Sequence, residues 1–249
     1  ASASGDATFR AMTGDATFGG KTSSANGDVL IEAKLGHATA EDIESKLDTT
    51  IVAGAVSVLG DIVSMGQVAL QALTGNVDVQ GSVTANGGLL LLEAGQGDAI
   101  INRIASLTNV SILALDLDRS GSISAGDEVQ LTSLDSGTTV VLGGDGGTGT
   151  VVLRNPAGLT IDADELSRIS TGKLRIDAEA NDALLLDVDF TGATLGDLSV
   201  GADNSSQIIA AGSVQGLDAL TLGYVDGADD RRPGLIVVPG ELGQDTTTG

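Results

Sequence analysis

The sequence of 249 residues predicts an all-β protein of the parallel β-helix (β-solenoid) class, with roughly 20–24 residues in each coil. Three observations predict this fold. Similar short segments recur along the chain, apolar and polar residues alternate within each segment, and glycines separate the segments. Aromatic residues make up only 2% of the composition, so valine, isoleucine, leucine and alanine must fill the interior. Such side chains suit a narrow and regular core.

The recurring segment begins with a small polar residue and a glycine turn, and continues as an alternating strand that ends in alanine or serine. We expect the small terminal residues Ala72, Ala94 and Ser133 at the corners of coils, and large residues such as Leu70, Leu131 and Ile176 inside the flat faces. Four copies are "SANGDVLIEA" (24–33), "SMGQVALQA" (64–72), "TANGGLLLLEA" (84–94) and "SAGDEVQLTS" (124–133).

Equivalent apolar positions recur at a nearly constant spacing. Val68 and Leu90 are 22 residues apart, and Leu90 and Val129 are 39 apart, which is close to two coils. The series continues through Val152, Leu174, Leu198 and Leu220 with steps of 23, 22, 24 and 22 residues. At about 22 residues per coil the chain makes roughly ten to eleven coils, and stacking at about 4.8 Å makes a rod of about 50 Å.

This spacing predicts a single solenoid over residues 1–249, in which 1–19 and 226–249 are extensions or assembly segments. The first segment contains an echo, "GDATF", that brings Phe9 and Phe18 to equivalent positions. Helical signals are weak: residues 38–47 read as a short helix or a loop excursion, and 162–170 are favoured as part of a coil because the flanking spacing is kept. Neither end shows a clear polar cap.

The charge and the cysteine content exclude several functions. With 12 basic and 34 acidic residues, the net charge of −22 repels phosphate backbones and anionic lipids, so we expect no nucleic-acid partner. No apolar run is long enough to insert into a membrane. The chain has no cysteine, which excludes disulfides and thiolate metal sites.

The stretch "LDLDRSGSISAGDE" (115–128) resembles a calcium-binding loop. Asp116, Asp118, Ser120 and Asp127 are the candidate calcium ligands, because such loops use Asp, Ser and Gly at alternating positions. A true EF-hand also needs flanking helices, and "VSILAL" before the loop is a strand. The same stretch fits the coil template, with Asp116 and Asp118 pointing outward. We favour a coil turn over an adventitious cation site, and both over an EF-hand; calcium is the one cofactor under consideration.

An enzymatic function is not expected. Polysaccharide-cleaving β-helices use paired carboxylates or a calcium cluster with a basic residue and aromatic platforms, and this chain has few basic residues and no tryptophan. The best local cluster is "DGADDRRPG", with Asp226, Asp229, Asp230, Arg231 and Arg232, which we interpret as a solvated loop with internal ion pairs. His37 is the sole histidine and is expected in a surface loop. "GGDGGTGT" (143–150) lacks the lysine of a phosphate loop.

The pattern "GxIxSxGxVxLxA" and the stretch "GLTIDADELSRISTGKLRIDA" resemble the filamentous haemagglutinin-like family of exported bacterial proteins, over most of residues 20–225. The resemblance implies a right-handed parallel β-helix at the cell surface that acts as an adhesin, a biofilm component or a stalk. It implies no catalytic residues.

We therefore expect an extracellular structural or adhesive solenoid. The alternatives are a module that binds polysaccharide or calcium and, less favoured, a degenerate polysaccharide-cleaving enzyme. The expected partners are further copies of the chain, bound end to end through Leu235 to Val238 and the N-terminal segment, and a polysaccharide of a host or neighbouring cell.

Overall fold

The computed structural model describes residues 1–144, 157–191, 194–226 and 229–238. The chain is all-β, with parallel coils stacked into a β-solenoid of about 10 turns. It divides into two compact units, Ala1–Val129 and Gln130–Gly249, which are described separately. The predicted fold class is thus confirmed, whereas the prediction of one solenoid domain over the whole chain stays a prediction.

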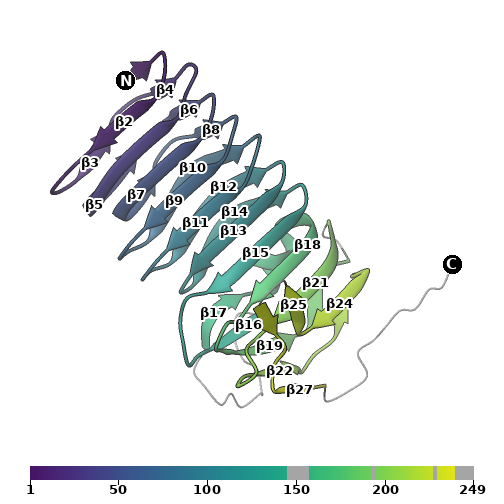
Figure 1. Ribbon diagram of the computed structural model, residues 1–249. Coiled ribbons are helices and arrows are strands. Elements are labelled where there is room, and N and C mark those ends of the chain that lie inside the picture. The colour runs from purple at the N-terminus through teal and green to yellow at the C-terminus, as the bar shows by residue number, and fades with distance from the viewer. Residues whose placement is uncertain (145–156, 192–193, 227–228, 239–249) are drawn as a thin grey trace. The chain divides into compact units, whose positions relative to one another are not determined.

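In the first unit the parallel pairings fall into three sets, which begin at β1, β2 and β3 and define three faces of the coil. Figure 1 shows these strands stacked coil on coil. Strands β5, β7, β10, β12 and β14 bend around a corner and serve two faces each. The strands are β1 (Ser2–Ala3), β2 (Ala7–Arg10), β3 (Ala16–Phe18), β4 (Thr22–Ser24), β5 (Val29–Ala40), β6 (Ile43–Ser45), β7 (Thr49–Val58), β8 (Ile62–Ser64), β9 (Val68–Ala72), β10 (Val77–Ala85), β11 (Leu90–Ala94), β12 (Ala99–Ser106), β13 (Asn109–Ala114) and β14 (Leu117–Ala125). Strand β15 (Glu128–Ser133) crosses the boundary between the units.

The coils are in register, so that like side chains stack in columns. Val68 pairs with Leu90, as predicted, and successive partners in the column that begins at Ala7 are 22, 20, 19, 22 and 20 residues apart. The next inward column of the same face consists of Phe9, Ile31, Ile51, Leu70, Leu92 and Ile112. All but the half-buried Phe9 are buried, which places the aliphatic core where the alternation predicts it.

Small residues turn the corners. Ala72, Ala94 and Ser133 are buried and each ends a strand, as predicted. At another corner Ser24, Ser45 and Ser64 stack in register, and their hydroxyl groups bond to neighbouring carbonyls and to each other. A buried hydroxyl group is tolerated there because it is satisfied by hydrogen bonds.

The N-terminal segment is part of this stack. Strand β1 pairs with β4, and β2 and β3 pair with β5, so residues of the segment 1–19 form the first coil. Phe9 and Phe18 pack edge to face, with ring centroids 4.8 Å apart, over the end of the aliphatic core. Residues 38–45 lie in β5 and β6 and the turn between them, and residues 46–47 lie in the bend after β6, so the expectation of a helix or loop excursion there is wrong.

The second unit is less regular. One sheet runs in the order β17, β16, β19, β22 and β27, and β18, β21 and β24 pair in another. The elements are β16 (Thr139–Gly143), β17 (Ala157–Ile161), α1 (Ala163–Ser167), β18 (Ile169–Asp177), β19 (Asp182–Leu186), β20 (Val188–Asp189), β21 (Leu195–Gly201), β22 (Gln207–Ala210), β23 (Val214–Gln215), β24 (Ala219–Leu222), β25 (Tyr224–Asp226), β26 (Asp229–Arg231) and β27 (Leu235–Val237).

The predicted steps from Leu174 to Leu198 and on to Leu220 are confirmed by pairing. Elsewhere the period is lost, since the partners Val140 and Ala183 are 43 residues apart. Val152 and most of the glycine-rich stretch 143–150 lie outside the described residues. In the part of the chain that the structure describes, no helix is long and apolar enough to span a bilayer.

The helix α1 corrects the prediction that 162–170 belong to a coil. Asp162 caps its N-terminus and accepts a hydrogen bond from the Glu165 backbone at 2.8 Å, while the Glu165 carboxylate accepts one from the Asp162 backbone at 3.1 Å. This reciprocal capping box stabilises the first turn, and Leu166 is buried against the unit.

Candidate functional site: corner acceptors and the Arg231 cluster

The predicted calcium ligands do not gather around one point. Asp116 is half-buried and its carboxylate accepts a hydrogen bond from the Leu117 backbone at 2.9 Å, whereas Asp118 is exposed on β14 opposite Ile100. Asp127 is exposed in the turn after β14, and the side chain of Ser120 lies outside the described residues. Across the described ranges, no group of three or more Asp, Glu or His side chains is arranged to hold a metal ion.

Another role for aspartate recurs instead. The residue before a strand in one coil accepts a hydrogen bond, through its side-chain oxygen, from the backbone N–H of the equivalent residue in the next coil. Asp6 accepts from Asp28 at 3.1 Å, Asp28 from Asp48 at 2.9 Å, and Asp48 from Gln67 at 2.7 Å. These side chains satisfy backbone donors at a corner, where the strand ladder is interrupted.

We call such residues corner acceptors. Those before β6, β8, β10 and β20 follow the same rule, with distances of 2.9–3.0 Å to the following coil. They are Asp42, which accepts from Asp61; Asp61, from Ser82; Asn76, from Asp98; and Asp187, from Ser213.

A glycine faces most corner acceptors. The residue before the donor is Gly27 opposite Asp6, Gly60 opposite Asp42, and Gly66 opposite Asp48, and a Cβ at any of them would collide with the carboxylate. The dipeptides Gly27-Asp28 and Gly60-Asp61 therefore have a stacking function: the glycine makes room for the acceptor of the preceding coil, and its aspartate accepts a hydrogen bond from the following coil. The glycine before an aspartate is visible in the sequence, but a turn explains the same pair of residues.

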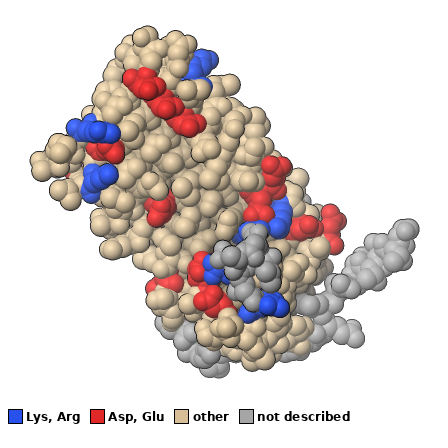
Figure 2. Space-filling model, viewed as in Figure 1, with Lys and Arg blue, Asp and Glu red and all other residues tan. Residues whose placement is uncertain are grey.

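The hydrogen bonds that one corner acceptor, Asp61, receives change the pKa of its carboxyl group. The hydroxyl group of Ser82, and secondly its backbone N–H, lower the pKa of Asp61 by bonding to the charged carboxylate. On the face drawn in Figure 2, acidic side chains gather in small groups between broad uncharged areas. Six aspartates are used between coils as corner acceptors: Asp6, Asp28, Asp42, Asp48, Asp61 and Asp187.

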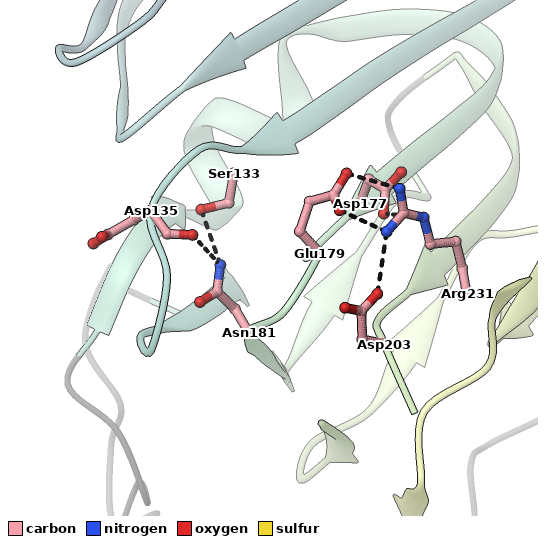
Figure 3. A network of polar contacts seen from close by, with 7 residues as sticks. All are labelled: Ser133, Asp135, Asp177, Glu179, Asn181, Asp203 and Arg231. Carbon is pink, nitrogen blue, oxygen red and sulfur yellow. Dashed lines mark hydrogen bonds and ion pairs between the residues drawn. The ribbon is translucent and has the colours of Figure 1, made fainter. Parts of the chain in front are cut away.

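The second unit gathers a different cluster around Arg231 (Figure 3). Its guanidinium group makes two hydrogen bonds to the Glu179 carboxylate, at 2.6 and 2.8 Å, and a third to Asp203 at 3.2 Å. Arg231 Nε lies 3.3 Å from Asp177 Oδ1. The interpretation of residues 226–232 as a solvated loop with internal ion pairs is therefore wrong for Arg231, whose side chain is only 16% exposed and pairs with distant residues. The side chains of Asp226, Asp229 and Asp230 lie outside the described residues.

The cluster connects successive coils. Ala178 donates to the Gly201 carbonyl, and Ala202 donates to the Arg231 carbonyl. Glu179 adopts a left-handed backbone conformation, with φ 52°, in the turn where its carboxylate meets Arg231. Tyr224 and Arg231 pack against Gly201, where a Cβ would collide with both.

Burial dominates the ionisation of two groups in this cluster, Asp177 and Tyr224. It raises the pKa of Asp177, against the attraction of Arg231, and it also raises the pKa of Tyr224. The guanidinium group of Arg175 lies 5.1 Å from the centre of the Tyr224 ring, a cation–π contact.

Asn181 forms a second buried polar centre in Figure 3. Its side chain is fully buried, accepts a hydrogen bond from the Thr138 backbone at 3.1 Å and donates one to the Asp135 carbonyl at 2.8 Å. This amide holds the turn between β15 and β16 against a segment more than 40 residues later in the chain. His37 is exposed, but it lies in β5 rather than in a loop, and its Nε2 is 2.9 Å from Ser57 Oγ.

The chain is thus a β-solenoid whose coils are connected by backbone ladders, corner acceptors and one arginine cluster. Comparisons with models of protein families, with curated proteins and with solved structures gave no match.

Proposed function

We propose that the chain is a structural or adhesive β-solenoid of the bacterial exterior, similar in role to the filamentous haemagglutinin-like proteins. The stacking of the coils supports a mechanical role, because backbone ladders, buried columns and corner acceptors all act in the direction of stacking. We propose no catalytic role, since the carboxylates gathered at Arg231 are engaged by that arginine.

We further propose that copies associate end to end. The observation that carries this is β27, the last strand of its sheet. Leu235 and Ile236 are 53% and 43% exposed there, and within the described residues no strand pairs with the outer edge of β27. The unpaired backbone N–H and C=O groups of an apolar strand edge of this kind can form hydrogen bonds with another strand. The N-terminal coil of a second copy is the proposed occupant, because β1–β3 also pair on one side only among the described strands.

Sedimentation velocity tests this proposal. The intact chain should form oligomers whose size grows with concentration, and Ile236→Lys should leave monomers, because a lysine on an edge strand disfavours pairing. Val63→Lys, at an exposed apolar position of the first unit, is the matched control and should not change the oligomers. A chain that stays monomeric at high concentration, or oligomers that survive Ile236→Lys, would contradict it.

A second candidate is binding of a polysaccharide. Thr17, Thr39, Ser57 and Asp78 form an outward column in register across four coils, and such hydroxyl and carboxylate groups bond to sugars. Calcium binding at Asp116, Asp118, Ser120 and Asp127 stays a prediction, and calorimetric titration with each ligand tests both.

A further inference from the structure

The last coil of the second unit contributes little buried apolar surface of its own. Strand β24 alternates between exposed and half-buried residues, and β27 has two exposed residues followed by a half-buried one. Each strand pairs with only one described neighbour, β24 with β21 and β27 with β22. The half-buried Leu220, Leu222, Tyr224 and Val237 thus contribute less apolar burial to this coil than the fully buried columns contribute to the first unit.

Arg231 supplies a further attachment. It lies between β24 and β27 in the chain, and its side chain reaches beyond the adjacent coil. Asp203 belongs to the preceding coil, whereas Asp177 and Glu179 belong to the one before it. One side chain thus fixes the last coil to two earlier coils. The bidentate pair with Glu179 also fixes its orientation, because the planar guanidinium group matches the carboxylate.

The ion pairs differ in how they respond to solvent. The side chains of Glu179 and Asp203 are 38% and 39% exposed, so dissolved ions screen their attraction to Arg231, whereas Asp177 is 7% exposed and is screened less. The attachment of the coil is therefore sensitive to ionic strength, in contrast to the buried aliphatic columns of the first unit.

We propose that Arg231 is an electrostatic lock on the last coil, which holds β24 and β27 in place and so controls whether the edge of β27 is ordered for docking. While Arg231 keeps its ion pairs, β27 stays paired with β22 in register, and the backbone groups of its outer edge are aligned to pair with another strand. When these ion pairs are broken, β24 and β27 separate from β21 and β22, and the aligned edge is lost. The link to docking rests on the proposed end-to-end association, but the lock itself does not.

Hydrogen exchange measured by mass spectrometry on the full chain tests the lock. Arg231→Met should speed exchange at least tenfold in residues 219–222 and 235–237, and leave residues 29–33 unchanged. Arg231→Lys, which keeps the charge but not the bidentate geometry, should give an intermediate increase. The matched control is Arg103→Met, which removes an exposed arginine from the first unit and should change neither segment.

The salt dependence of hydrogen exchange distinguishes an electrostatic contact of Arg231 from a contact that only packs. Raising sodium chloride from 0.05 to 1 M shortens the screening length from more than 10 Å to about 3 Å. It should speed exchange in the two segments severalfold in the wild type and have no such effect in Arg231→Met. If Arg231→Met fails to fold, Glu179→Gln should give the same pattern with a smaller increase.

The proposal is overturned if exchange in these segments is unchanged in the variants, if it rises equally over residues 157–238, or if salt acts equally on wild type and Arg231→Met. Sedimentation separates the two proposals. Localised, salt-dependent exchange in a wild type that stays monomeric supports the lock and contradicts the end-to-end association.

Discussion

The two units of the chain stabilise the stacking of their coils by different contacts. In Ala1–Val129 the coils repeat with steps of 19–22 residues in the column from Ala7, and the described interior consists of aliphatic columns with serines at one corner. In Gln130–Gly249 the steps vary, a short helix interrupts the strands, and a buried amide and an arginine cluster connect distant segments.

This difference shows that a regular stack of coils and a specific arrangement of coils depend on different kinds of contact. A regular column stabilises every coil equally, but it does not distinguish one coil from the next. Buried polar groups stabilise little on balance, yet they specify one arrangement, because any other leaves them unsatisfied. We therefore expect the first unit to depend on apolar packing and the second on particular polar contacts. The predictions below test that contrast, from the largest effect to the smallest.

Leu70→Asp should be the most damaging change in the first unit. Leu70 is fully buried in the central column, so the carboxylate would have neither water nor a partner, and we expect a loss of about 4 kcal/mol or more. Ala69→Asp, on the outward side of the same strand, should cost about 1 kcal/mol or less. Urea unfolding followed by circular dichroism measures both, and equal losses would show that the strand faces are inverted.

Asn181→Ala should have the largest polar effect in the second unit. It leaves the Thr138 N–H and the Asp135 carbonyl without their buried partner, at a cost of about 3 kcal/mol. The control Asn204→Ala removes an exposed amide and should cost about 0.5 kcal/mol or less. Hydrogen exchange of the Thr138 N–H should be faster in Asn181→Ala, because this N–H loses its acceptor. Unchanged exchange there would contradict the role of Asn181 in holding the turn.

Asp48→Ala tests the corner acceptors. The carboxylate accepts a hydrogen bond from the Gln67 backbone, and its loss should cost about 1–2 kcal/mol and speed exchange of that N–H. Asp118→Ala removes an equal charge from an exposed strand position and should have almost no effect. If both changes have the same effect, the aspartates contribute only through net charge.

Asp177→Asn should have the smallest effect, visible mainly as a change in pH dependence. Burial raises the pKa of Asp177, so its contribution to stability is fully present below the usual pKa of a carboxyl group and is lost as pH rises through the raised pKa. Thermal unfolding from pH 3 upward should show that the midpoint of the wild type falls relative to that of Asp177→Asn. A difference between the two midpoints that does not change with pH, or an equal change in the control Asp118→Asn, would contradict this assignment.

The sequence was sufficient to predict the first unit because period-two alternation and a near-constant repeat determine which residues face inward. Leu70 of the first unit is buried as predicted, and so are Leu131 and Ile176 of the second unit, where the alternation is kept locally. The constant spacing does not predict α1, because the capping box of Asp162 and Glu165 stabilises a helical turn within one repeat. The spacing does not predict the Arg231 cluster either, because Asp177, Glu179 and Asp203 lie far from Arg231 in the sequence and only the stacking of irregular coils brings them together.

The central claim, that parallel coils stack in register, is tested most directly by disulfide cross-linking, for which the absence of native cysteine is an advantage. Thr50 and Ala69 are register partners in adjacent coils, whereas Thr50 and Leu91 are separated by an intervening coil. A disulfide needs Cα atoms within about 7 Å, and two coil steps span about 9.6 Å. Under mild oxidation, Thr50→Cys combined with Ala69→Cys should cross-link within the monomer, and Thr50→Cys combined with Leu91→Cys should not. Cross-linking of the second pair, or of neither, would contradict the stacked solenoid.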